Sequence, residues 1–195
     1  MIKLLDILEN KILVPRRSKE ERQKNHLISV QKKIQQYIKD GSKGDLNLSY
    51  TRITSLPNNL KVGGYLYLNT TPIDSLPDNL QVGGDLDLSN TPITSLPDDL
   101  EVVGDLYLRN TKITSLPDDL EVGGYLELNN TPITSLPNNL KVGGHLDLTK
   151  TKITSLPDDL EVGGDLDLRN TPISKKYSEE EIRQIVPGVR GAIYI

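Results

Sequence analysis

The sequence predicts a β-solenoid with helical caps, in which short parallel strands stack along one side and the return side holds few or no helices. Nearly the same twenty residues recur without an insertion from about residue 44 to residue 174, and a period of this length is typical of solenoids. Within each copy one half alternates apolar and polar residues, as a half-buried strand does. The other half contains prolines, which exclude a full helix.

Residues 1–40 are predicted to form a basic, helical N-terminal cap or arm, because a stack of apolar layers must be covered at its ends. They carry ten lysines and arginines against five acidic residues, whereas residues 41–195 carry thirteen against twenty-two. Ser18 and Glu21 have the spacing of a capping box, and Gly41 suits the end of the helix. An apolar stripe at helical spacing lies between them: Leu27, Val30, Ile34 and Ile38.

The stretch IKLLDILE at 2–9 is a candidate for another short helix, joined to the first by the segment around Pro15. Forty residues are more than a cap requires. Two interpretations follow, a large cap or an arm that docks on another protein or subunit.

Residues 41–176 are predicted to form the solenoid, with about seven repeats of twenty residues. The stretch GGDLDLSN at 83–90 predicts a glycine turn followed by a strand, and TPITSLPDDL at 91–100 predicts an extended return. The glycines equivalent to Gly44 are expected to need a positive φ or a close approach of backbone, whereas the preceding site tolerates Val103. The threonines equivalent to Thr51 are expected to bond backbone in the turn.

Residues 177–195 are predicted to close the stack with a helix and a terminal strand. Ser178 and Glu181 again have capping-box spacing, and Pro187 ends the helical pattern. In RGAIYI, Ile193 and Ile195 are expected to match the paired leucines of the earlier strands.

The repeated pattern LxLxxTxITSLPxxL resembles the short bacterial-type leucine-rich repeat, whose pattern is LxLxxNxLTSLPxxL. The match covers roughly two thirds of the chain and recurs six or seven times. Threonines equivalent to Thr51 replace the family's asparagine, and glycines equivalent to Gly63 fill a site that is often apolar. A gently curved ribbon and a β-helix-like rod both fit. The resemblance implies that ligands meet the exposed face of the strand sheet.

The residues on that face are those that flank each leucine pair, because successive side chains of a strand point to opposite sides. They vary from repeat to repeat while the core positions do not, which favours recognition of a partner protein. We expect tyrosine anchors and a partner with a basic patch, since tyrosine supplies contact area at a low entropy cost. The alternative interpretation is that this face is simply a solvated, charged sheet surface that binds no partner. The candidate binding residues are Tyr65, Tyr67, Asp85, Asp87, Asp105, Tyr107, Tyr125, Glu127, His145 and Asp147.

Other classes of function are disfavoured by the sequence. Cysteine is absent and only two histidines occur, so we expect no disulfide, no metal, no cofactor and no enzyme. Asp147 and Asp167 resemble a glycosidase pair, but repetition produces such pairs automatically. An acidic face repels nucleic acid. No stretch approaches the ~20 apolar residues of a membrane span.

The sequence thus predicts a non-catalytic, protein-recognition scaffold that acts in the cytoplasm. Virion and secreted locations stay open, and so does homo-oligomerisation. The alternative function is a structural component of a larger assembly, such as a virus particle, anchored by the N-terminal arm.

Overall fold

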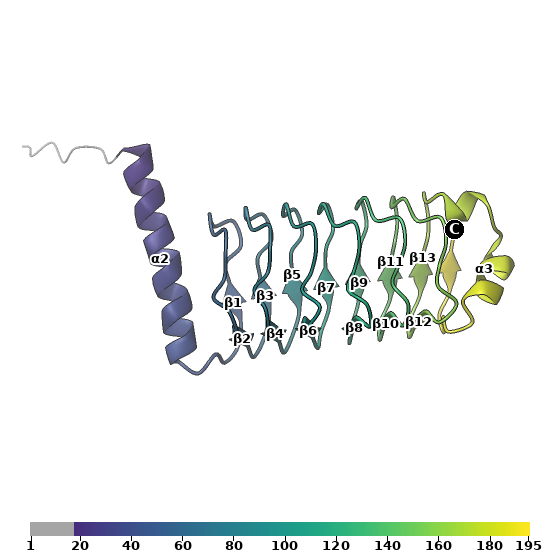
Figure 1. Ribbon diagram of the computed structural model, residues 1–195, viewed down its shortest axis with the longest axis horizontal. Coiled ribbons are helices and arrows are strands. Elements are labelled where there is room, and N and C mark those ends of the chain that lie inside the picture. Colours follow the sequence, from purple (N-terminus) through teal and green to yellow (C-terminus); the bar gives the residue numbers. More distant parts are fainter. Residues whose placement is uncertain (1–17) are drawn as a thin grey trace, which may run out of the picture.

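The computed structural model describes residues 18–195 and shows coils stacked in a nearly straight row, with a helix at each end (Figure 1). The short helix predicted at 2–9 lies outside the described residues. The predicted fold class, a parallel-sheet solenoid with few helices, is confirmed.

One side of every coil contributes a strand to an eight-stranded parallel sheet, here called sheet A. Each leucine pairs with the leucine one repeat later, as Leu46 does with Leu66, so the twenty-residue period sets the register. The strands in spatial order are β1 (Leu46–Asn47), β3 (Leu66–Tyr67), β5 (Leu86–Asp87), β7 (Leu106–Tyr107), β9 (Leu126–Glu127), β11 (Leu146–Asp147), β13 (Leu166–Asp167) and β14 (Ile193–Tyr194).

The return side holds a second parallel sheet of six strands, here called sheet B, which the sequence patterns did not predict. Its strands are two residues long, like those of sheet A, and they follow the proline-bearing half of the repeat, for which the sequence predicted only an extended return. They are β2 (Lys61–Val62), β4 (Gln81–Val82), β6 (Glu101–Val102), β8 (Glu121–Val122), β10 (Lys141–Val142) and β12 (Glu161–Val162).

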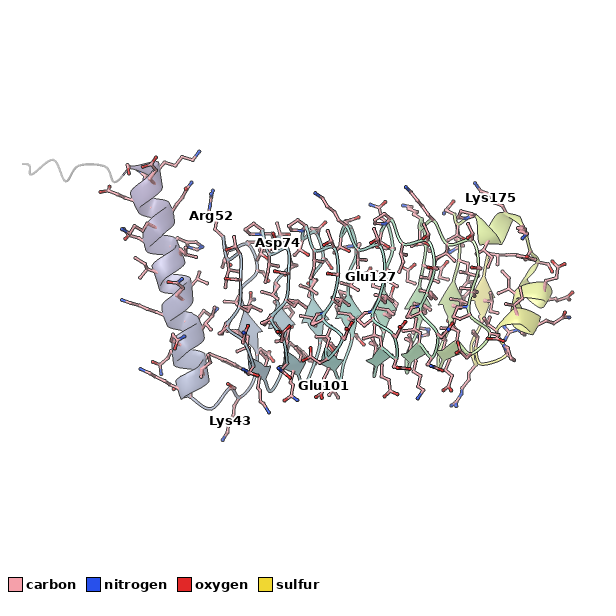
Figure 2. All side chains as sticks on the ribbon, viewed as in Figure 1. Lys43, Arg52, Asp74, Glu101, Glu127 and Lys175 are labelled. Carbon is pink, nitrogen blue, oxygen red and sulfur yellow. The ribbon has the colours of Figure 1, made fainter. Side chains whose placement is uncertain are left out.

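The core between the sheets is built from repeated columns of leucine, isoleucine and valine. Leu86, Leu88 and Ile93 of one coil are each 0% exposed, as are their equivalents in the next coil. Identical aliphatic layers stack at the strand spacing, so the chain needs no aromatic side chain to fill irregular space. Charged side chains point outward instead; Lys43 and Glu101 project near sheet B, and Arg52 and Lys175 project from the opposite edge (Figure 2).

The turn after each strand of sheet A uses a left-handed residue followed by a threonine. Asn90, Asn110 and Asn130 have φ of 59°, 57° and 56°, a conformation that asparagine tolerates better than most residues. The next residue, as in Thr91, donates its hydroxyl to the carbonyl of the leucine three residues earlier at 2.7 Å. The predicted threonine–backbone bonds are therefore confirmed, and most of these threonines are buried.

The glycine turns differ in part from their prediction. Among the described glycines equivalent to Gly44, only Gly44 itself has a positive φ, of 71°. The later ones are required by close approach, since a Cβ at Gly104 would lie 2.7 Å from the carbonyl carbon of Gly84. The preceding site is also crowded, because a Cβ at Gly143 would lie 2.1 Å from the Gly123 carbonyl oxygen. Val103 nevertheless occupies that site in one coil.

The helix α2 (Lys19–Lys39) lies beside the first coil and begins with the predicted capping box of Ser18 and Glu21. Of its apolar stripe, Val30 and Ile34 are buried, whereas Leu27 and Ile38 are 37% and 39% exposed. The Tyr37 hydroxyl donates to the Gly44 carbonyl at 2.8 Å and accepts from the Gly63 amide at 3.2 Å, and the Lys33 ammonium donates to the Asn47 carbonyl. The helix thus covers the first coil with only part of the predicted stripe.

At the other end, a 3₁₀ turn η1 (Ile173–Lys175) leads to α3 (Glu179–Ile185), which Ser178 and Glu181 cap as predicted. Ile193 of β14 pairs with Leu166 and is buried. Ile195 was expected to be the second core residue of this strand but is 46% exposed, so that part of the prediction is wrong. The division of the chain at residues 41 and 177 stays a prediction.

None of the helices within residues 18–195 is both long enough and apolar enough to cross a membrane.

Candidate functional site

The outward face of sheet A, here called the strand face, carries the side chains on either side of each leucine pair. Since the strands are parallel and in register, equivalent residues form two rows, one before and one after the first leucine. The structure brings all ten sequence-predicted binding residues onto this one face. They lie on five adjacent coils and are Tyr65, Tyr67, Asp85, Asp87, Asp105, Tyr107, Tyr125, Glu127, His145 and Asp147.

Acidic residues in the first row join one coil to the next. Asp85 accepts the amide N–H of Asp105 at 2.9 Å, and Asp105 accepts that of Tyr125 at 2.7 Å, each through its Oδ1 atom. His145 takes the same place, because its Nδ1 atom accepts the amide of Asp165 at 2.8 Å. One oxygen of each of these carboxylates therefore bonds the backbone of the next coil, and the second oxygen of Asp105 accepts the Tyr107 hydroxyl.

Acidic residues in the second row bond the backbone of their own turn. Asp87 accepts the amide of Ser89 at 2.9 Å, and Asp147 accepts that of Thr149 at 2.8 Å. This short-range bond is the Asx turn that aspartate and asparagine favour where a strand ends. Glu127 occupies the same row and is only partly exposed.

The tyrosines form two edge-to-face pairs. The rings of Tyr65 and Tyr67 have centroids 6.0 Å apart and planes at 89°. Those of Tyr107 and Tyr125 are also 6.0 Å apart, at 76°. Such geometry is favourable because the positive edge of one ring meets the negative face of the other. Both pairs therefore present ordered aromatic surface.

Carboxylates fix the second pair further. The Tyr107 hydroxyl donates to Asp105 Oδ2 at 2.7 Å, and the Tyr125 hydroxyl donates to Asp147 Oδ2 at 3.2 Å. Partial burial raises the pKa of Tyr107 and of Tyr125 well above the usual value, and the neighbouring carboxylates raise it further. Both hydroxyls consequently stay protonated and act as hydrogen-bond donors.

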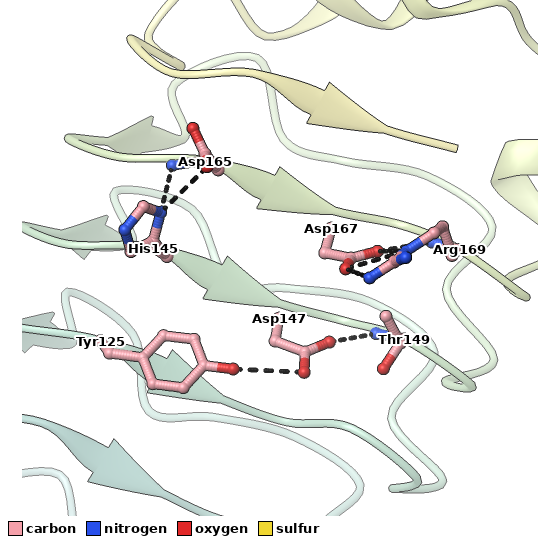
Figure 3. Close-up of polar contacts among 7 residues, drawn as sticks. All are labelled: Tyr125, His145, Asp147, Thr149, Asp165, Asp167 and Arg169. Atoms are coloured by element: carbon pink, nitrogen blue, oxygen red, sulfur yellow. Dashed lines mark hydrogen bonds and ion pairs between the residues drawn. The ribbon is translucent and has the colours of Figure 1, made fainter.

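A shallow hollow of about 270 Å³ lies on the strand face at its C-terminal end. Figure 3 shows its polar contacts, in which Arg169 forms an ion pair with Asp167, at 2.5 Å from Nη2 to Oδ2. The Arg169 guanidinium also lies 5.7 Å from the centroid of the Tyr194 ring. The lining residues are Tyr125, His145, Leu146, Asp147, Asp165, Asp167 and Tyr194.

Four residues of this hollow, the core residue Leu146 together with Asp165, Asp167 and Tyr194, were not among the predicted binding residues. The signal for the two aspartates was present in the sequence, because they occupy the positions that His145 and Asp147 hold one coil earlier. Tyr194 also had a signal, because the predicted match of Ile193 to the leucines puts it in line with Asp167, with which it pairs in the structure.

Within residues 18–195, no three histidine, aspartate or glutamate side chains come together in a way that could hold a metal ion. The face therefore offers aromatic surface, carboxylates and hydrogen-bond donors.

Comparison with known proteins bears on the fold. A solved structure described as a Shigella effector leucine-rich-repeat domain is similar to this chain, with a TM-score of 0.56 and 18% sequence identity. The match covers 87% of this chain and 90% of that one. No protein-family profile matches the sequence, and no curated protein sequence does. The fold is thus a leucine-rich-repeat-like solenoid.

Proposed function

We propose that this chain is a non-catalytic recognition scaffold that binds a partner protein through the strand face. The observation that carries the proposal is the ordered tyrosine pair of Tyr107 and Tyr125 in the middle of sheet A. Its rings are fixed by each other and by two carboxylates, so little side-chain entropy remains to be lost on binding. Tyrosines placed in this way are typical anchors of protein interfaces.

The charge of the face favours a partner with a basic surface. Asp85, Asp87 and Asp105 lie beside the tyrosines; Asp85 and Asp87 each use one oxygen for a backbone bond, and Asp105 uses its second oxygen to accept the Tyr107 hydroxyl. Complementary charge speeds association and excludes acidic partners such as nucleic acid.

Affinity capture from the native source tests the proposal. The bait is the full chain, and the variant is Tyr65→Ser/Tyr107→Ser/Tyr125→Ser, with the fold checked by circular dichroism. We expect a specific partner to be captured by the wild type and lost at least about tenfold by the variant, because anchor residues commonly contribute about 2 kcal/mol or more each. Tyr50→Ser is the matched control, since Tyr50 is 74% exposed in a turn and lies off the strand face.

A second candidate is a structural component of an assembly, anchored by the N-terminal arm. It is favoured by the apolar side chains that α2 leaves exposed, which include Leu27 at 37% and Ile28 at 40%. Capture that survives the tyrosine variant but fails after deletion of residues 1–17, or in Leu27→Ser/Ile28→Ser, would establish this candidate and exclude the first.

The repeat pattern further supports membership of the short bacterial-type leucine-rich-repeat family, and the lack of cysteine supports a cytoplasmic site of action. Fractionation of source cells checks the location.

A further inference from the structure

We infer that the hollow at the C-terminal end of the strand face binds an arginine side chain presented by the partner protein. This inference rests on the proposed function, because it names the chemistry that the strand face recognises. The expected ligand group is a guanidinium, and equal binding of an ammonium or a neutral side chain in the test below would contradict the inference.

The shape and lining of the hollow suit a planar cation. Tyr125 and Tyr194 supply aromatic rings, and Leu146, which is 1% exposed, lies at the base. Aromatic faces attract cations, arginine more often than lysine, since the guanidinium also stacks on the ring. A volume of about 270 Å³ fits one side chain rather than a segment of chain.

The charge of the hollow is only partly compensated, since three carboxylates line it, and Arg169, which pairs with Asp167, also interacts electrostatically with Asp147. Asp167 is paired with Arg169, but no ion pair joins Asp147 or Asp165 to a lysine or arginine in the described part of the chain. The ionisable side chain beside Asp165 is His145, at 3.5 Å from Nδ1 to Oδ2. That nitrogen already accepts the Asp165 amide proton, so in this arrangement the imidazole brings no positive charge to the carboxylate.

The two carboxylates are held in place before any ligand arrives. Asp147 accepts the Thr149 amide through Oδ1 and the Tyr125 hydroxyl through Oδ2, as Figure 3 shows. Asp165 accepts the Ala192 amide through Oδ1 at 2.8 Å. Each oxygen keeps a second lone pair, so these bonds orient the carboxylates toward the hollow without using up their capacity as acceptors.

The molecule already contains an example of the contact we infer. The Arg169 guanidinium is held by both Asp167 oxygens, from Nε at 2.9 and 3.1 Å and from Nη2 at 2.5 Å. At the same time it lies 5.7 Å from the centroid of the Tyr194 ring. A carboxylate and a tyrosine at the rim therefore hold one guanidinium. A second carboxylate and tyrosine, Asp147 and Tyr125, also line the hollow, where the Tyr125 hydroxyl donates to Asp147.

Titration of the ¹⁵N-labelled full chain with blocked tripeptides tests the inference by NMR at physiological salt. The probes are Gly-Arg-Gly, Gly-citrulline-Gly and Gly-Lys-Gly. We expect saturable amide shifts at His145, Asp165 and Tyr194 with the arginine peptide and half-saturation at roughly 1 mM, the affinity of a single charged anchor. Citrulline has the same shape without charge and is expected to bind at least about tenfold more weakly, because charge-assisted bonds are the stronger ones.

Paired variants separate the site from the general charge of the face. Asp147→Asn/Asp165→Asn keeps the Oδ1 acceptors and removes two charges, and it should weaken binding of the arginine peptide about tenfold. Asp85→Asn/Asp87→Asn makes the same change three coils away and should weaken binding less than about twofold, since exposed charges beyond ~8 Å are screened.

The inference is overturned by unsaturable shifts, by equal binding of citrulline or lysine, or by equal loss in the two double variants. Its failure is distinguishable from failure of the proposed function. If the tyrosine variant loses the partner but the arginine peptide does not bind, the strand face is the interface and the hollow is not its arginine site.

Discussion

Sheet A and sheet B come from the same repeat, but the hydrogen bonds that join their strands differ in regularity. In sheet A the amides of the paired leucines donate to the next coil at 2.7–2.9 Å along the whole stack. In sheet B the amides of the column that contains Gly83 donate at distances from 2.8 Å, between Gly83 and Val62, to 3.4 Å, between Gly123 and Val102. The irregularity is local, because the bonds on either side of it in this column return to 2.8–2.9 Å.

The long bonds surround Val103, the residue that replaces a glycine in its column. The Glu101 amide donates to the Leu80 carbonyl at 3.4 Å. In the described chain, Val102 and Val122 are the only residue pair that joins β6 to β8. Backbone from the adjacent coil closes this column, so a side chain there pushes the coils apart. The strand face varies from coil to coil because its side chains point outward, although several of them also bond backbone. At the edge of sheet B, Val103 is accompanied by long hydrogen bonds, whereas Lys43 of the first coil is followed by a Gly63–Ser42 bond of 2.9 Å.

Replacing one buried leucine on each side of the coil by alanine tests the difference between the two sheets and should have the largest effect on stability. Leu106 of sheet A is 0% exposed, and Leu100, just before β6, is 7% exposed. We expect Leu106→Ala to lower the free energy of unfolding by about 4 kcal/mol and Leu100→Ala by about 2 to 3, because a loosened strand relaxes into the cavity more easily. Urea unfolding followed by circular dichroism measures both. An equal or larger loss for Leu100→Ala would contradict the comparison.

A second valine in the glycine column should reproduce the irregularity. Gly143→Val places a Cβ 2.1 Å from the Gly123 carbonyl oxygen before relaxation. We expect a loss of about 1 to 3 kcal/mol and faster hydrogen exchange at the Gly163 amide, whose bond to Val142 is now 2.8 Å. Val103→Ala, which keeps a Cβ at an already exposed position, is the control and should change stability by no more than about 0.5 kcal/mol.

The reverse change, Val103→Gly, should restore the ladder of sheet B. Hydrogen exchange at the Glu101 and Gly123 amides is expected to slow as their bonds shorten toward those of the other coils. The free energy of unfolding should move by less than about 1 kcal/mol, because glycine loses more backbone entropy on folding and offsets the gain. Unchanged exchange at both amides would place the cause of the long bonds elsewhere.

The sequence predicted sheet A in detail because its signal is periodic. Leu46, Leu48 and Ile53 recur at a fixed spacing, and the fixed spacing itself determines the parallel register. Sheet B was not predicted, although Leu60 and Val62 recur at the same spacing, because the prolines beside them indicated an extended return or turn rather than a paired strand. The order of elements was therefore predictable, and the pairing of the return side was not.

The strand face, too, was predictable from the sequence only in part. Alternation places Tyr107 and Asp147 on one face, and this could be predicted from the sequence. That Asp105 bonds the Tyr125 amide and the Tyr107 hydroxyl depends on side-chain geometry between coils, which no repeat pattern contains. Much of the acidity that suggests a basic partner also serves the backbone, and only the structure separates the two roles.

Glu127 provides the smallest effect, and it concerns the strand face alone. Partial burial raises the pKa of its carboxyl, Asp147 and Asp87 raise it further, and Arg109 opposes them. Between the pKa of about 4.3 in the unfolded chain and the raised pKa of the fold, the folded state binds more protons. Stability from this group therefore falls as the pH rises through that window.

Glu127→Gln should accordingly make the fold slightly more stable at pH 7 and leave it unchanged below about pH 4, where the carboxyl is protonated in both states. The gain is expected to be less than about 0.5 kcal/mol, since solvent screens a half-exposed carboxylate. Urea unfolding at the two pH values measures it, with Glu161→Gln on sheet B as the control for loss of an exposed charge. A gain of the same size at both pH values would mean that the glutamate acts through packing. In that case the neighbouring carboxylates Asp147 and Asp87 do not destabilise the charged form of Glu127. The two sheets then differ only in the regularity of their backbone hydrogen bonds.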